Sequence, residues 1–378
     1  MNRNLNILQI ASVGLPVTPQ LKYGGTERVI SYLDETFSKM GHNSYVAATG
    51  DSVVKGTLIP TISKSQWCID GTVSITRSII RKDEIINEHY QKCIDYLIKN
   101  PDIDIAHDHP GSGLVTTERF KKAQPNLKIP ILVTLHGAVS GKYHERYAKW
   151  AKISQKGSGV YFNAISESQR NEFEKVGIRV EDVVYHGIPM GRFVPSQEKK
   201  SDFLFTIGRI APEKGQDLAI EVAKRSHRKL VIAGEVHSIN ENYWKEKVEP
   251  FVDGDQVKFV GPLTDEEKIP YFQDASALIF PLQWKEPFGL VLIESMGCGT
   301  PVISFDRGSI PEIVEDGKTG FVIHETGDKQ KDLEQMVYAV NNLNSIDSNV
   351  CRSHVENSFS IETEAQNYLN LYDRLMNS

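Results

Sequence analysis

The sequence predicts a parallel α/β protein of two domains, and three observations support this prediction. Short apolar runs that are typical of buried strands alternate with stretches whose apolar residues recur at helical spacing. The 378 residues suffice for about two domains of roughly 100 to 200 residues each. A polar, lysine-rich segment at 195–202 interrupts the alternation, which then restarts. We therefore predict one domain over residues 1–195, a second over 196–360, and a last helix within 361–378 that packs back on the first.

The composition is that of an ordinary globular protein, with 40% hydrophobic and 24% charged residues. The net charge of −6 leaves no basic excess to neutralise phosphates, so we expect no nucleic-acid partner. The cysteines fit no disulfide framework or zinc spacing and predict reduced thiols in a cytoplasmic protein; they are Cys68, Cys93, Cys298 and Cys351. No apolar run reaches the ~18 residues of a membrane span, so any membrane contact is expected to be peripheral.

The first predicted domain alternates strands with helices. We expect strands at 6–13, 44–48, 102–107, 130–134, 159–165 and 183–185, and helices at 27–40, 83–98 and 168–176. The first helix is predicted because four apolar residues fall on one helical face: Val29, Ile30, Leu33 and Phe37. Residues 51–82 are rich in turn formers and are expected to be irregular.

A glycine pair, Gly24 and Gly25, stands between the first strand and the first helix. Because glycine has no Cβ, backbone N–H groups there can approach an anion closely, and the helix dipole favours negative charge. The pair matches neither the GxGxxG dinucleotide fingerprint nor a Walker A loop, so nicotinamide or ATP binding is not supported. A tight turn explains the glycines equally well, and both interpretations stay open.

Histidines follow two predicted strands at their carboxyl ends, which is the edge where open α/β sheets bind ligands. His107, Asp108 and His109 come at the end of the third strand, and His136 with Gly137 follows the fourth. An imidazole at this edge could donate to a sugar hydroxyl or a phosphate oxygen, or it could be satisfied by backbone. The His-x-His pair suggests a metal, but no third ligand follows at a recognised spacing, so we expect none.

The second predicted domain repeats the alternation. We expect strands at 203–207, 229–233, 257–260, 277–280 and 301–304, and helices at 216–225, 265–273, from 290 onward, at 308–316 and at 361–376. Arg209 and Lys214 bracket the turn before its first helix. Two cations beside a helix N-terminus repel each other and the dipole unless an anion binds between them, which favours a phosphate ligand over a merely solvated turn.

The segment 281–304 contains two carboxylates, Glu286 and Glu294, eight positions apart. Gly289 ends the loop between them, and the apolar residues after it predict the first turn of a buried helix whose N–H groups could bind phosphate. Glu294 stands in so apolar a helix that its carboxylate needs hydrogen-bond donors. Either ligand hydroxyls or a neighbouring Lys or Arg could supply them.

Four motifs in this order resemble the family 4 glycosyltransferases of the two-Rossmann-domain kind called GT-B, over nearly the whole chain. They are Gly24-Gly25-Thr26-Glu27-Arg28 with Gly41-His42, then His136-Gly137, then Gly208-Arg209-Ile210 with Glu213-Lys214-Gly215, and Glu286-Pro287-Phe288-Gly289 through Glu294 to Gly299-Thr300-Pro301-Val302. The Glu-x7-Glu element is the most specific of them. One departure is His186, which stands where many relatives have asparagine, and it leaves the role of that position open.

The resemblance implies an N-terminal acceptor domain, a C-terminal donor domain and a retaining, metal-independent transfer of a hexose-type sugar. The donor would be a UDP- or GDP-sugar, with no cofactor, and the acceptor a glycan, a lipid-linked molecule or a small molecule. By this analogy Glu286 and His136 are the catalytic residues at the transferred sugar, and Glu294 binds the ribose. The remaining donor contacts would be Arg209 and Lys214 with Gly24, Gly25, Phe288, Gly289, Leu290 and Val291 at the diphosphate, and Val260 and Leu263 at the base. The acceptor pocket would use the loops 51–82 and 138–159.

Two other functions fit the same motifs. A GT-B isomerase or phosphorylase would convert a nucleotide sugar, or a sugar and phosphate, without an acceptor. A non-catalytic protein would bind a nucleotide sugar and release it unchanged.

Overall fold

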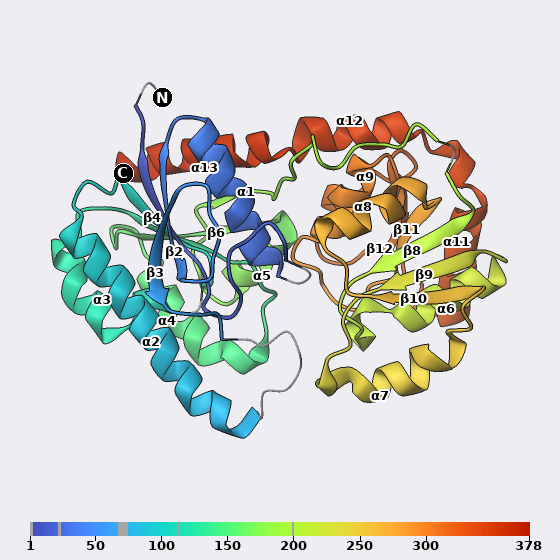
Figure 1. Ribbon diagram of the computed structural model, residues 1–378, viewed down its shortest axis with the longest axis horizontal. Helices are drawn as coiled ribbons and strands as arrows, with labels where there is room; N and C mark the ends of the chain where they lie inside the picture. Colours follow the sequence, from blue (N-terminus) through green and yellow to red (C-terminus); the bar gives the residue numbers. More distant parts are fainter. Residues whose placement is uncertain (1–2, 22–23, 67–74, 112, 199) are drawn as a thin grey trace. The chain divides into compact units, whose positions relative to one another are not determined.

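The computed structural model describes residues 3–21, 24–66, 75–111, 113–198 and 200–378, so Tyr23 and Cys68 lie outside the described residues. The chain forms two compact units, Met1–Tyr185 with Glu364–Ser378, and His186–Thr363. The sequence-based boundaries lie at 195 and 360, and the assignment of acceptor and donor to the two units stays a prediction. Figure 1 shows both units.

The first unit contains one parallel sheet and the helices that follow its strands. Its strands are β1 (Asn6–Ile10), β2 (Asn43–Thr49), β3 (Thr57–Ile62), β4 (Ile105–Asp108), β5 (Ile131–Thr134), β6 (Val160–Ala164) and β7 (Asp182–Val183). Its helices are α1 (Gly25–Lys39), α2 (Ile75–Lys99), α3 (Glu118–Ala123), α4 (His144–Ile153), α5 (Glu167–Lys175) and most of α13 (Ile361–Met376). The strand order is β3-β2-β1-β4-β5-β6-β7, and every pairing is parallel.

The second unit repeats the same plan. Its strands are β8 (Phe203–Ile207), β9 (Lys229–Ala233), β10 (Val257–Gly261), β11 (Ala277–Phe280), β12 (Val302–Phe305) and β13 (Gly320–Ile323). Its helices are α6 (Gln216–Arg225), α7 (Glu241–Tyr243), α8 (Asp265–Asp274), α9 (Leu290–Gly297), α10 (Ile310–Ile313), α11 (Lys329–Asn341) and α12 (Ser348–Ser358). The strand order is β10-β9-β8-β11-β12-β13, again all parallel.

Strand order positions the candidate site in both units. Each sheet reverses its direction of winding once, between β1 and β4 in the first unit and between β8 and β11 in the second. Ligands of open α/β sheets bind at the carboxyl ends of the strands at such a switch point. The carboxyl ends of these four strands and the segments that follow them are therefore the ones to examine. They contain the glycine pair at the start of α1, His107–His109, Arg209 and Glu286.

The predicted fold class is confirmed, and most element boundaries agree to within about two residues. The expectation of an irregular stretch over 51–82 was wrong, because β3 lies inside it and α2 begins at Ile75. β3 is an edge strand with Pro60 inside it, and proline is tolerated at an edge, so a turn-rich composition concealed a strand. The loop expected over 138–159 contains α4.

Apolar side chains pack between sheet and helices in each unit. In the first, Leu8, Ile94 and Phe162 belong to one fully buried core, and in the second Leu204, Val222 and Ile303 do so. Among the described residues, no helix is both long and apolar enough to cross a membrane.

Candidate functional site

The second unit places both predicted cations next to carboxylates. Arg209 follows β8 and donates to Glu213 Oε1 at 2.5 Å, whereas Lys214 donates to Glu286 Oε2 at 2.6 Å. Each cation is thus neutralised without a bound anion. Repulsion between the two cations therefore does not require a phosphate, because Glu213 and Glu286 already balance their charges. The role of Arg209 and Lys214 at a diphosphate stays a prediction.

Hydrogen bonds fix both the side chain and the backbone of Glu286. The indole Nε1 of Trp284 donates to Glu286 Oε2 at 2.9 Å, and Ser309 N donates to its carbonyl oxygen at 3.0 Å. Gly308 has a φ of +65°, and a Cβ there would lie 2.3 Å from that carbonyl oxygen, so only glycine fits. The side chains of Lys214 and Glu286 are 14% and 12% exposed, which leaves a narrow access to the pair.

The helices that follow three of the switch-point strands begin without a capping side chain. Gly24, Gly215 and Gly289 are the N-cap residues of α1, α6 and α9, with φ values of 121°, 71° and 89°. Side chains cap α3, α5, α8, α11 and α12, and they belong to Thr117, Ser166, Thr264, Asp328 and Asp347. A helix start without a cap leaves N–H groups for water or for a ligand. The predicted diphosphate contacts Leu290 and Val291 are the first residues of α9.

Glu294 is fully buried in α9, and a lysine meets its need for a donor. Lys268 of α8, itself 2% exposed, lies 2.7 Å from Glu294 Oε1 and 2.8 Å from Asp265 Oδ1. Of the two alternatives that the sequence left open, the structure shows the neighbouring lysine. The ribose contact of Glu294 stays a prediction. Val260 and Leu263, predicted to line the base, are half-buried at and after the end of β10.

The first unit brings three histidines together. His107 stacks on His109 with ring centroids 3.8 Å apart, and His109 Nδ1 lies 3.3 Å from His136 Nε2. Thr134 donates to Asn163 Oδ1, so its oxygen accepts from His107 Nε2 at 2.6 Å. His107 Nδ1 then accepts from the Tyr372 hydroxyl at 2.7 Å, which corresponds to the neutral Nε2–H tautomer. His107 is therefore a buried structural residue that ties β4 to α13.

Asp108 stands between His107 and His109 in the sequence and is fully buried. Burial raises the pKa of Asp108 to about 7, although the backbone N–H of Gly111 opposes the shift. Burial also raises the pKa of Glu27, which follows Gly24 and accepts from Ser12 Oγ at 2.6 Å. Within the part of the chain that the structure describes, no three His, Cys, Asp or Glu side chains are grouped to hold a metal.

The predicted site residues are thus divided between the two units. His136 and the glycine pair belong to the first unit, and Arg209, Lys214, Glu286, Glu294 and the start of α9 to the second. Sequence analysis missed Trp284 and Lys268. Trp284 stands two positions before Glu286, the spacing that puts side chains on one side of an extended segment, and Lys268 stands one helical turn after Asp265. These two spacings are the sequence features that could have predicted the contacts of Trp284 and Lys268.

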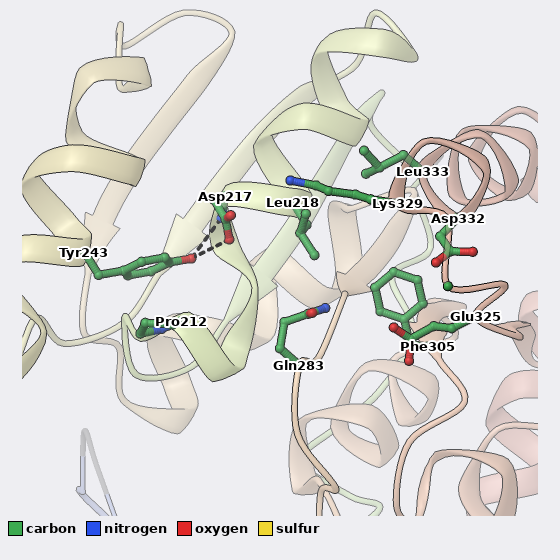
Figure 2. A pocket seen from close by; sticks show the side chains of 11 residues that line it. Pro212, Asp217, Leu218, Tyr243, Gln283, Phe305, Glu325, Lys329, Asp332 and Leu333 are labelled. Carbon is green, nitrogen blue, oxygen red and sulfur yellow. Dashed lines mark hydrogen bonds between the residues drawn. The ribbon is translucent and has the colours of Figure 1, made fainter.

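A cavity of about 320 Å³ lies next to Pro212, which stands between Arg209 and Lys214 in the sequence. It is lined by Pro212, Asp217, Leu218, Tyr243, Gln283, Phe305, Glu325, Gly327, Lys329, Asp332 and Leu333. Figure 2 shows the Tyr243 hydroxyl against Asp217, to which it donates at 2.8 Å. Arg307 binds Glu325 through two nitrogens, and Thr326 binds Asp332. Because these carboxylates already have partners within the protein, we assign the cavity no ligand.

Comparison with known proteins agrees with this architecture. The family "Glycosyl transferases group 1" matches residues 191–345. An uncharacterized 41.2 kDa protein of the cps region of Klebsiella pneumoniae is 27% identical over 239 residues, covering 62% of this chain and 60% of that protein. The putative glycosyltransferase YtcC of Bacillus subtilis is 25% identical over 325 residues, covering 76% of this chain and 77% of YtcC.

Two solved structures share the fold over nearly the whole chain. AviGT4, a glycosyltransferase involved in avilamycin A biosynthesis, superposes with a TM-score of 0.71 and 20% identity, covering 99% of this chain and 98% of AviGT4. Anabaena Alr3699/HepE, solved with UDP and glucose, has a TM-score of 0.74 and 16% identity, covering 98% of this chain and all of that chain. The protein has the GT-B fold. The segment that matches the group 1 glycosyltransferase family lies within the second unit.

Proposed function

We propose that this protein transfers a hexose-type sugar from a UDP- or GDP-sugar to a glycan, lipid-linked or small-molecule acceptor. One observation carries the proposal: the Lys214 ammonium and the Glu286 carboxylate lie 2.6 Å apart beside the uncapped start of α9. A nucleotide sugar joins a hydroxyl-bearing ring directly to a diphosphate. A ligand of this kind needs a cation and a hydrogen-bond acceptor as close neighbours, and this loop supplies both.

The proposed reaction retains the anomeric configuration and needs no metal. Breaking the sugar–phosphate bond builds negative charge on the leaving diphosphate, which Arg209, Lys214 and the first N–H groups of α9 stabilise. A leaving phosphate oxygen takes the proton of the acceptor hydroxyl on the same face. Glu286 then positions the sugar through its hydroxyls and does not act as a nucleophile, in contrast to a retaining glycosidase.

The test begins with a thermal-shift panel of UDP-, GDP- and ADP-sugars, because a ligand that binds the folded state stabilises it. With the donor that stabilises most, we expect Arg209→Ala and Lys214→Ala to lower nucleoside diphosphate release by roughly 10- to 100-fold, the effect of one lost charge-assisted hydrogen bond. Glu294→Ala is expected to lower release as well. Arg225→Ala is the matched control, because Arg225 pairs with Glu221 at the far end of α6.

Full activity in all three variants would contradict the assignment. NMR of the product should show the anomeric configuration of the donor, and EDTA should leave the rate unchanged. A donor that is converted without an acceptor, alone or with phosphate, would favour the isomerase or phosphorylase. Tight binding without any turnover would identify a binding protein.

A further inference from the structure

We propose that Trp284 is a positioning residue, whose indole N–H holds the Glu286 carboxylate while Lys214 binds the donor diphosphate. The inference rests on the proposed function for what Glu286 and Lys214 contact. The link between Trp284 and Glu286 itself rests on the structure alone.

Trp284 contacts both members of the ion pair. Its Nε1 donates to Glu286 Oε2 at 2.9 Å, and the Lys214 ammonium lies 4.8 Å from the centroid of its ring. Lys214 donates to the same oxygen, Oε2, at 2.6 Å. Both donors therefore bind Oε2, and among the described residues no side chain donates to Oε1. Oε1 is the oxygen available to a sugar hydroxyl.

The backbone of Glu286 is fixed by other means, so Trp284 acts on the side chain. Ser309 N binds the Glu286 carbonyl oxygen, and Gly308 packs so closely on that peptide that a Cβ would overlap it. These contacts leave the side-chain torsions of Glu286 undetermined. Two hydrogen bonds to Oε2 then decide where Oε1 points.

The two donors differ in how they respond to an anion. A diphosphate attracts the Lys214 ammonium, because a phosphate oxygen competes with the carboxylate for the same positive charge. The indole N–H is also a donor, but it carries no net charge, so an arriving diphosphate attracts it less strongly than it attracts the ammonium. Trp284 therefore keeps the Glu286 carboxylate oriented while Lys214 binds the leaving diphosphate.

The first test separates binding from turnover. Trp284→Phe retains an aromatic ring under Lys214 but removes the N–H. With UDP-glucose and GDP-mannose as probes, we expect kcat for nucleotide release to fall by about 10- to 100-fold, because a hydrogen bond to a charged group is lost. Affinity for UDP or GDP should stay within about twofold, because those ligands lack the sugar that Glu286 contacts. Trp244→Phe is the matched control, since Trp244 packs on Phe259.

The second test needs no turnover. The indole N–H resonance of Trp284, identified by its loss in Trp284→Phe, should shift in Glu286→Gln, while the indole resonances of Trp150 and Trp244 stay in place. A wild-type kcat in Trp284→Phe, or an unmoved Trp284 resonance in Glu286→Gln, would overturn the positioning role. A wild-type protein that binds no nucleotide would instead overturn the proposed function, and the NMR result would still report the Trp284–Glu286 bond by itself.

Discussion

The two units use one strand plan for two kinds of polar site. In the second unit the switch-point loops and the helix beside them contain ion pairs: Arg209 with Glu213, Lys214 with Glu286, and Lys268 with Asp265 and Glu294. In the first unit the corresponding edge contains His107, Thr134 and Tyr372 in a hydrogen-bonded network that needs no charge. The fold therefore fixes where polar groups gather but not whether they are charged.

The difference has an energetic consequence. A buried charge is stable only with its partner in place, so the removal of one member of a buried ion pair leaves a large uncompensated cost. A neutral hydrogen bond costs much less when one donor is removed. The second unit should therefore be the more sensitive of the two to loss of a single polar side chain.

Lys268→Met is expected to have the largest effect. It would leave the carboxylates of Asp265 and Glu294, which are 4% and 0% exposed, without their shared cation. We expect a loss of about 3 to 5 kcal/mol in the free energy of unfolding, measured by urea denaturation at pH 7. Lys245→Met, which breaks the exposed pair with Glu241, serves as the control and should show no measurable change. A loss of less than about 1 kcal/mol for Lys268→Met would mean that the triad does not stabilise the unit.

Tyr372→Phe tests the neutral network with a smaller change. Tyr372 is fully buried, and burial raises the pKa of its hydroxyl well above the usual range, so it remains a donor to His107 Nδ1. Its loss leaves one buried ring nitrogen without that donor, and we expect about 1 to 2 kcal/mol of destabilisation in the same urea experiment. Tyr338→Phe, at a side chain that is 68% exposed, is the control. If Tyr372→Phe costs as much as Lys268→Met, the contrast between the two units fails.

The same contrast explains how far the sequence could predict the molecule. Strand periodicity and glycine positions are local properties, so β8, β11 and α6 were predicted to the residue, and the GT-B fold followed from the order of the motifs. Partners are not local. Glu286 and Lys214 are 72 positions apart, and His107 and Tyr372 are 265 apart, so no spacing rule links them. The edge strand β3 was missed because its proline and the turn formers on either side of it outweigh a short apolar pattern.

His186 makes the stability of the second unit depend on pH. It is fully buried in the second unit with its ring 5.1 Å from that of Phe288, and burial lowers its pKa from 6.5 to about 3. Between pH 6.5 and about 3, His186 is therefore protonated in the unfolded chain but neutral in the folded chain. The free energy of unfolding falls as the pH falls through this range. Between pH 7.5 and 5.5 the loss amounts to about 1 kcal/mol.

His186→Asn introduces the residue that the resemblance leads us to expect at this position and removes the titrating group. We expect the wild-type free energy of unfolding to fall by about 1 kcal/mol more than that of His186→Asn between pH 7.5 and 5.5, measured by urea denaturation at each pH. His144→Asn, at an exposed position of α4, should keep the wild-type slope. Equal slopes for wild type and His186→Asn would show that His186 takes up a proton in the folded protein. The folded second unit would then hold a charged imidazole beside Phe288, whereas the burial of His186 predicts a neutral one.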